Sequence, residues 1–93
     1  MSNQVFSYGT LTSKFNDFEP ARMTGFYSID TSEMYPRLVK DKELSVISGH
    51  LMYLTDEEFK EADEYEGYPE LYTRVKKKVI LDSGLITTAW VYI

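Results

Sequence analysis

The sequence predicts an α+β fold, namely a small, mostly antiparallel barrel of five to six strands with one main helix. Several runs that alternate apolar and polar residues and are rich in tyrosine, valine and isoleucine predict the strands. One amphipathic stretch, introduced by a capping box, predicts the helix. The sheet is small and aromatic residues make up 15% of the chain, so we expect the sheet to curl toward a barrel.

The strand predictions depend on these runs and on the residues that end them. The expected strands cover residues 4–8, 22–29, 45–54, 72–81 and 86–93. Gly9 ends the first strand, Gly25 interrupts the second, and Gly49 marks a bulge or a close backbone approach in the third. Asp82-Ser83-Gly84 joins the last two strands as a hairpin loop, with glycine where the left-handed conformation is needed.

Two segments carry no regular pattern. Residues 12–21 are polar and aromatic without a clear period, and Pro20 would break a helix there. Residues 30–44 contain Tyr35-Pro36 and several charges, so we expect a loop with at most one short helical turn.

The predicted helix spans residues 55–66 and begins with the capping box Thr55-Asp56-Glu57-Glu58. At about 100° per residue, Phe59, Ala62 and Glu66 share one stripe, and Gly67 is suited to end the helix. Glu66 therefore lies on the face that should meet the core. In the last turn its carboxylate also opposes the negative end of the helix dipole. Because the helix itself does not stabilise this carboxylate, its position indicates a tertiary or catalytic role.

The composition indicates one domain over residues 1–93 and restricts the function classes. The net charge of −5 argues against an extended nucleic-acid-binding surface. The basic run Lys76-Lys77-Lys78 is interpreted as protection of a strand edge or as a local anion contact. The chain has no cysteine, which excludes disulfides and thiolate nucleophiles. It also has no apolar run of the roughly 18 residues that span a membrane and no recognisable signal peptide, so we expect a cytoplasmic protein.

The turn after the first strand is a second candidate site. Tyr8-Gly9-Thr10-Leu11 places successive backbone amides after a glycine, which can form an anion-binding concavity or an oxyanion hole. We expect Gly9 to act through close approach of its backbone and an unusual φ. Taken alone, the tetrapeptide is also typical of an ordinary turn.

Seven short motifs follow one another in a recognisable order. They are Tyr8-Gly9-Thr10-Leu11, Gly25 with Tyr27, Tyr35-Pro36, Gly49-x-Leu51, Asp63-x-x-Glu66-Gly67, Tyr72-x-Arg74 and Ala89-Trp90-Val91-Tyr92. Over residues 5–92 this order resembles the γ-glutamylcyclotransferase-like family, in its γ-glutamylamine cyclotransferase type. The resemblance implies a small barrel with a pocket between the first motif and Glu66.

The resemblance also implies an activity, a transferase or lyase reaction that cyclises a γ-glutamyl group to 5-oxoproline and releases an amine or amino acid. It assigns general acid/base catalysis to Glu66. Substrate binding is assigned to the residues of the other matching motifs, Tyr8, Gly9, Thr10, Leu11, Tyr72 and Arg74. A partly buried carboxylate has a raised pKa and can take a proton from the substrate's α-ammonium group. Such a reaction requires no metal, cofactor or covalent nucleophile.

The residues also allow other interpretations. Glu66 can be a structural carboxylate near Tyr72 or Arg74, and Arg74 can bind a carboxylate of the substrate or of the protein itself. Asp63 is interpreted as structural, capping a turn or pairing with Arg74, and Tyr92 as core rather than pocket lining. The whole domain can be a non-catalytic module that holds a small ligand, or an interaction domain whose pocket is filled. The sequence does not reveal the oligomeric state or which amine leaves.

Overall fold

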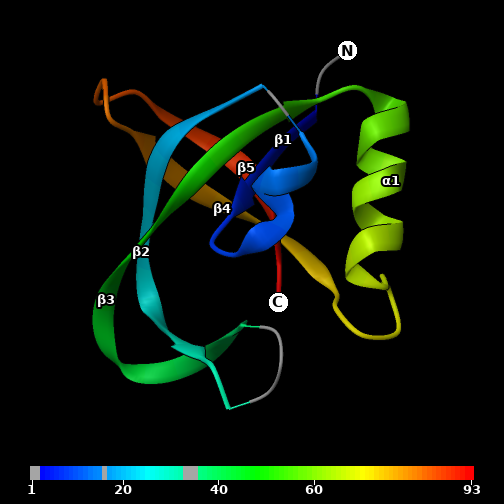
Figure 1. Ribbon diagram of the computed structural model, residues 1–93. Helices are drawn as coiled ribbons and strands as arrows, with labels where there is room; N and C mark the ends of the chain where they lie inside the picture. The colour runs from blue at the N-terminus through cyan, green and yellow to red at the C-terminus, as the bar shows by residue number, and fades with distance from the viewer. Residues whose placement is uncertain (1–2, 16, 33–35) are drawn as a thin grey trace.

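Five strands close into a barrel in a computed structural model that describes residues 3–15, 17–32 and 36–93. The elements are β1 (Asn3–Ser7), the 3₁₀ helix η1 (Thr10–Lys14), β2 (Phe18–Asp30), β3 (Arg37–Leu54), α1 (Asp56–Glu66), β4 (Arg74–Leu81) and β5 (Ile86–Tyr92). The strand order around the barrel is β1-β3-β2-β4-β5, and α1 lies against its side (Figure 1). The predicted α+β barrel with one main helix is therefore confirmed.

The barrel is mostly antiparallel, as predicted. The exception is the pair formed by β1 and β5, in which Val5 lies opposite Trp90 and Phe6 opposite Val91 in parallel register. On its other side β1 pairs antiparallel with β3. The first and last strands thus close the barrel together.

The loop expected over residues 30–44 is wrong for residues 37–44, which begin the long strand β3. This part of β3 pairs with β2, from Asp30 opposite Arg37 to Tyr27 opposite Lys40. These residues form a strand because it buries the Leu38 side chain in the core and leaves the charged residues 40–43 exposed. The expected helical turn falls partly on residues 33–35, which lie outside the described residues.

The start of β2 also differs from the prediction. The strand begins at Phe18 rather than at residue 22, and it contains Pro20 opposite His50 of β3. Proline removes a backbone donor, which a strand tolerates best where one side is unpaired. In the structure β2 pairs with β4 only through Ala21 and Arg22, so Pro20 precedes the doubly paired part. The segment before it, expected to be irregular, contains η1.

The lysine run lies on a strand edge, as one of the two interpretations predicted. β4 pairs with β5 along its length, whereas its pairing with β2 is confined to Ile80 and Leu81. Lys76-Lys77-Lys78 therefore belongs to a stretch of β4 paired on one side within the described residues. The charges blunt this edge against pairing with another chain.

Helix α1 forms as its signals predicted. The Thr55 hydroxyl accepts a hydrogen bond from the Glu58 amide, and the Glu58 carboxylate accepts one from the Thr55 amide. Gly67 ends the helix in the left-handed conformation at φ 69°. Ala62 is fully buried against the barrel. No helix in the described parts of the chain has the length and apolar character needed to cross a bilayer.

The core has two parts, and the candidate site takes side chains from both. Buried apolar side chains such as Phe6, Leu51 and Val91 fill the barrel. A second group lies between the barrel and α1 and includes Leu11 and Tyr72. Phe6 of the first part lines the same cavity as Leu11 and Tyr72 of the second.

Candidate active site

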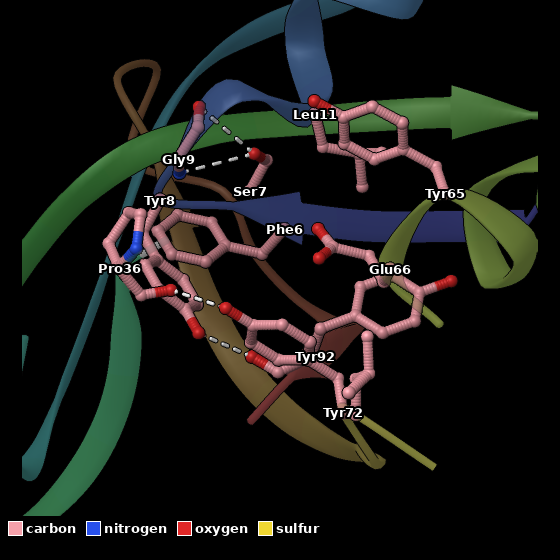
Figure 2. A pocket seen from close by; sticks show the side chains of 11 residues that line it. Phe6, Ser7, Tyr8, Gly9, Leu11, Pro36, Tyr65, Glu66, Tyr72 and Tyr92 are labelled. Atoms are coloured by element: carbon pink, nitrogen blue, oxygen red, sulfur yellow. Dashed lines mark hydrogen bonds between the residues drawn. The ribbon is translucent and has the colours of Figure 1, made fainter. Parts of the chain in front are cut away.

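A cavity of about 220 Å³ opens between the turn after β1, the start of β3 and the end of α1. Figure 2 shows the side chains around it. The lining residues are Phe6, Ser7, Tyr8, Gly9, Leu11, Pro36, Tyr65, Glu66, Leu71, Tyr72 and Tyr92. Most of these side chains are aromatic or aliphatic, and Glu66 is the charged member of the set. The cavity is thus an apolar hollow with one carboxylate in its wall.

Glu66 is the last residue of α1, and its carboxylate points into the cavity (Figure 2). The residue is half-buried, and this burial raises the pKa of the Glu66 carboxyl group. The positive charge of Arg37 lowers that pKa in part. The expectation that Glu66 would be partly buried and would face a cavity shared with Gly9 is therefore confirmed.

The hydroxyl of Tyr8 makes two hydrogen bonds that hold the cavity wall opposite Glu66 in place. It donates a hydrogen bond to the Tyr92 carbonyl oxygen at 2.6 Å and accepts one from the Leu38 amide at 3.0 Å. Burial raises the pKa of Tyr8 to about 12. Because this hydroxyl is neutral and already bonded on both sides, Tyr8 forms a fixed wall rather than a proton donor.

Tyr72 fixes a second side of the cavity. Its side chain is buried, and its hydroxyl donates a hydrogen bond to the Pro36 carbonyl oxygen at 2.8 Å. This bond connects the segment after α1 with the start of β3. The cavity walls therefore come from three parts of the chain that hydrogen bonds hold in place.

Gly9 lines the cavity, but the predicted unusual φ is wrong. Its φ of −135° lies outside the left-handed region, and the positive-φ glycines are Gly67 and Gly84. A Cβ at Gly9 would lie 3.4 Å from Cγ of Pro36, which is an ordinary contact. Gly9 thus leaves space beside Pro36, and with ψ at −141° its backbone lies outside the helical, extended and left-handed regions. Leu11 follows it in the cavity wall, whereas the side chain of Thr10 lies outside the described part of the structure.

Arg74 binds a carboxylate of the protein itself, one of the two alternatives that the sequence left open. Its guanidinium donates to both carboxylate oxygens of Asp63, at 3.0 and 3.4 Å. It is also packed between aromatic rings, those of Phe59, Tyr68 and Trp90, at 4.4–4.6 Å. Arg74 is not among the cavity-lining residues, so the structure separates it from Glu66 and Tyr8.

Asp63 pairs with Arg74, one of the structural contacts that the sequence suggested. In addition to the Arg74 ion pair, its carboxylate accepts a hydrogen bond from the Tyr92 hydroxyl at 2.6 Å. Tyr92 belongs to both the core and the cavity wall, whereas the sequence favours the core. Asp63 thus connects α1 to Arg74 of β4 and to Tyr92 of β5.

Sequence reasoning missed several residues at this site. Pro36 and Leu71 line the cavity, and Arg37 lies beside them with its guanidinium 4.2 Å from the centre of the Tyr72 ring. Tyr65 precedes Glu66 in the helix and could have been found from that position. Arg37 gave no such signal, because the segment around it was expected to be a loop.

The described residues do not form a metal centre, since they contain no cluster of three or more His, Asp or Glu side chains placed to hold a metal ion. The described lining of the cavity offers a carboxylate of raised pKa in an apolar hollow.

Comparison with known proteins gives this hollow a family context. A family model described as "Gamma-glutamyl cyclotransferase, AIG2-like" matches residues 5–93. The chain belongs to this family. The cavity therefore occurs in a γ-glutamyl cyclotransferase-like barrel, and the resemblance inferred from the seven motifs is confirmed.

Individual relatives are consistent with this family membership. The chain is 33% identical over 97 residues to "Putative gamma-glutamylcyclotransferase MJ1514" of Methanocaldococcus jannaschii. The alignment covers 95% of this chain and 81% of that protein. The fold is similar to a solution structure of At3g28950.1 from Arabidopsis thaliana, with a TM-score of 0.81 and 23% identity. It is also similar to an AIG2-like protein of Mus musculus, with a TM-score of 0.77 and 20% identity. All or nearly all of this chain is covered in both cases, but it spans 62% of the plant protein and 76% of the mouse protein.

Proposed function

We propose that this protein cyclises a γ-glutamyl group to 5-oxoproline and releases the attached amine, with Glu66 as the general acid/base. One observation carries the proposal: the half-buried Glu66 carboxylate, with its raised pKa, faces an apolar cavity that it shares with the turn after β1. Membership of the γ-glutamyl cyclotransferase, AIG2-like family supports the same activity.

The proposed reaction needs one base and a fixed substrate conformation. Glu66 takes a proton from the α-ammonium group, and the resulting amine attacks the γ-carbonyl carbon of the same glutamyl group. A C–N bond forms and the bond to the leaving amine breaks, while protonated Glu66 gives its proton to that amine. The ring nitrogen then loses a second proton through the same carboxylate, and the amine leaves as an ammonium ion. Because the ring closes within one molecule, orientation by the cavity walls supplies much of the acceleration.

The walls have complementary tasks in this proposal. Tyr8 and Tyr72, held by their hydrogen bonds, form rigid apolar sides against which the glutamyl chain folds. The turn at Gly9, Thr10 and Leu11 presents backbone amides to the substrate's carboxylate or to the developing oxyanion. The small side of the cavity at Gly9 leaves room for the substrate next to Pro36.

A panel of γ-glutamyl compounds tests the proposal. The purified protein is incubated with γ-glutamyl amines, γ-glutamyl amino acids and glutathione, and 5-oxoproline is detected by mass spectrometry. Release of 5-oxoproline from at least one compound is the expected result. If every compound stays intact but some bind, the cavity belongs to a non-catalytic ligand-binding module, and the catalytic proposal fails.

The raised pKa of Glu66 predicts the acid side of the pH–rate profile. Glu66 accepts a proton only when it is ionised, so kcat/KM should fall as the pH drops through its folded-state pKa. Because burial raises that pKa above its ordinary value of 4.5, the midpoint of the fall should lie above pH 4.5. Initial rates between about pH 4 and 8 measure it, and circular dichroism over the same range checks that the fold persists. Rates that stay level down to pH 4.5 would contradict the assignment.

A further inference from the structure

Arg37 lies at the rim of the cavity. It follows the lining residue Pro36, and its Nη2 atom donates a hydrogen bond of 2.6 Å to the carbonyl oxygen of Leu71. Its guanidinium also lies 4.2 Å from the centre of the Tyr72 ring. Leu71 and Tyr72 both line the cavity, and Leu71 is 67% exposed. The guanidinium is thus fixed at the place where the cavity wall reaches solvent.

The charge of Arg37 acts on the cavity. It lowers the pKa of Glu66 against the effect of burial and also acts to lower the pKa of Tyr8, so its field reaches two opposite walls. The other arginines have carboxylate partners, Asp63 for Arg74 and Asp82 for Arg22. Within the described residues Arg37 forms no ion pair, although Asp30 lies opposite it in the β2–β3 ladder and feels its charge.

A guanidinium held in this way is suited to bind a carboxylate. It carries five N–H donors in a planar fork, and the bond to Leu71 uses a single donor atom. The contacts to Leu71 and Tyr72 fix the plane of the fork in advance, which lowers the entropy lost when a carboxylate binds. No cation is among the residues that line the cavity itself.

We propose that Arg37 recognises a carboxylate on the leaving group, so that the preferred substrates are γ-glutamyl amino acids or peptides rather than simple γ-glutamyl amines. This inference depends on the proposed cyclisation. In that reaction the α-amine of the glutamyl group must reach Glu66, which places the glutamyl group inside the cavity. The part beyond the γ-carbonyl then extends to the rim, where Arg37 lies beside Leu71. This assignment departs from the γ-glutamylamine type that the sequence indicated.

Two substrates that differ by one carboxylate test the proposal. They are γ-L-glutamyl-L-alanine and γ-L-glutamylethylamide, and kcat/KM is measured for both at the same pH. We expect the wild type to prefer the alanine compound by about tenfold, the size of effect that a charge-assisted hydrogen bond gives. Arg37→Gln should reduce this preference to about twofold or less, chiefly by slowing the alanine compound. Any change in the Glu66 pKa affects both substrates alike and cancels in the ratio.

Arg22→Gln is the matched control, because it removes the same charge from an arginine that is paired with Asp82 and does not line the cavity. It should keep the wild-type preference. Arg37→Lys retains the positive charge but loses the planar fork of donors, so it should keep part of the preference for the alanine compound. A variant that had only lost its fold would not keep this preference, so Arg37→Lys distinguishes carboxylate recognition from unfolding. If Arg37→Gln slows both substrates equally, the residue supports the cavity or binds the glutamyl carboxylate, and the proposal is overturned.

Binding measurements distinguish a failure of this proposal from a failure of the proposed function. The dissociation constants of both compounds are measured by calorimetry with Glu66→Gln alone and with Glu66→Gln combined with Arg37→Gln. If the protein turns over neither compound but binds the alanine compound more tightly in an Arg37-dependent way, cyclisation fails and carboxylate recognition stands. If it binds both compounds equally, or binds neither, carboxylate recognition by Arg37 fails.

Discussion

Glu66→Gln should lower 5-oxoproline release by about 10²-fold or more, since removal of a general base typically costs that much. Glutamine keeps the shape and the polarity of the side chain but cannot accept the proton of the α-ammonium group. The loss should appear mainly in kcat, because the cavity and its walls remain. Mass-spectrometric rates for the wild type and the variant, with whichever γ-glutamyl compound is the best substrate, measure the effect.

The stability of the same variant serves as its control. The pKa of Glu66 is raised in the folded state, so ionisation of this group favours the unfolded chain, and the cost is present at pH 7 and absent below about pH 4. Glu66→Gln should therefore unfold at the same or a higher temperature than the wild type at pH 7, with the difference vanishing in acid. An inactive variant that is also less stable at pH 7 would mean that Glu66 supports the fold, and full activity would move the role elsewhere.

Gly49→Ala should destabilise the protein by about 3 kcal/mol or more, because the overpacking involves backbone as well as a side chain. A Cβ at Gly49 would lie 2.2 Å from the Ser7 carbonyl oxygen and 2.8 Å from Cζ of Phe6. Both contacts belong to β1, which pairs with β3 at this place, so the two strands would have to separate. The close backbone approach that the sequence suggested for Gly49 is confirmed by these distances.

Urea denaturation measures this effect, with Gly9→Ala as the matched control. A Cβ at Gly9 meets only Cγ of Pro36, at 3.4 Å, and the φ of −135° lies outside the left-handed region. Gly9→Ala should therefore change the free energy of unfolding by less than about 1 kcal/mol. Equal stability of the two variants would show that β1 and β3 can separate at little cost.

The parts of this fold that local chemistry determines could be predicted from the sequence. The capping box at Thr55 and the left-handed glycine at Gly67 define α1 without any tertiary information. Gly84, at φ 92°, defines the last hairpin in the same way. Glu66 could be found because a carboxylate on an apolar stripe is anomalous within the helix itself.

The parts that depend on distant contacts could not be predicted. Leu38 and Val39 are a short apolar pair among charges, and their strand becomes evident only when β2 lies beside it. Arg74 had two possible carboxylate partners, and only the packing of α1 against β5 selects Asp63. Arg37 meets Tyr72 and Leu71 only after the barrel closes, since these residues are more than thirty positions apart in sequence.

Because β1 pairs with β5, the barrel can close only after the last strand is available. Tyr8 and the Tyr92 carbonyl oxygen that it contacts are 84 positions apart, so the chain loses much loop entropy before this contact forms. While the protein is being synthesised, the cavity has no complete wall until β5 has left the ribosome. A compound that fits the cavity therefore binds the closed barrel rather than its precursors, and it should slow unfolding and reduce proteolysis of the newly made chain.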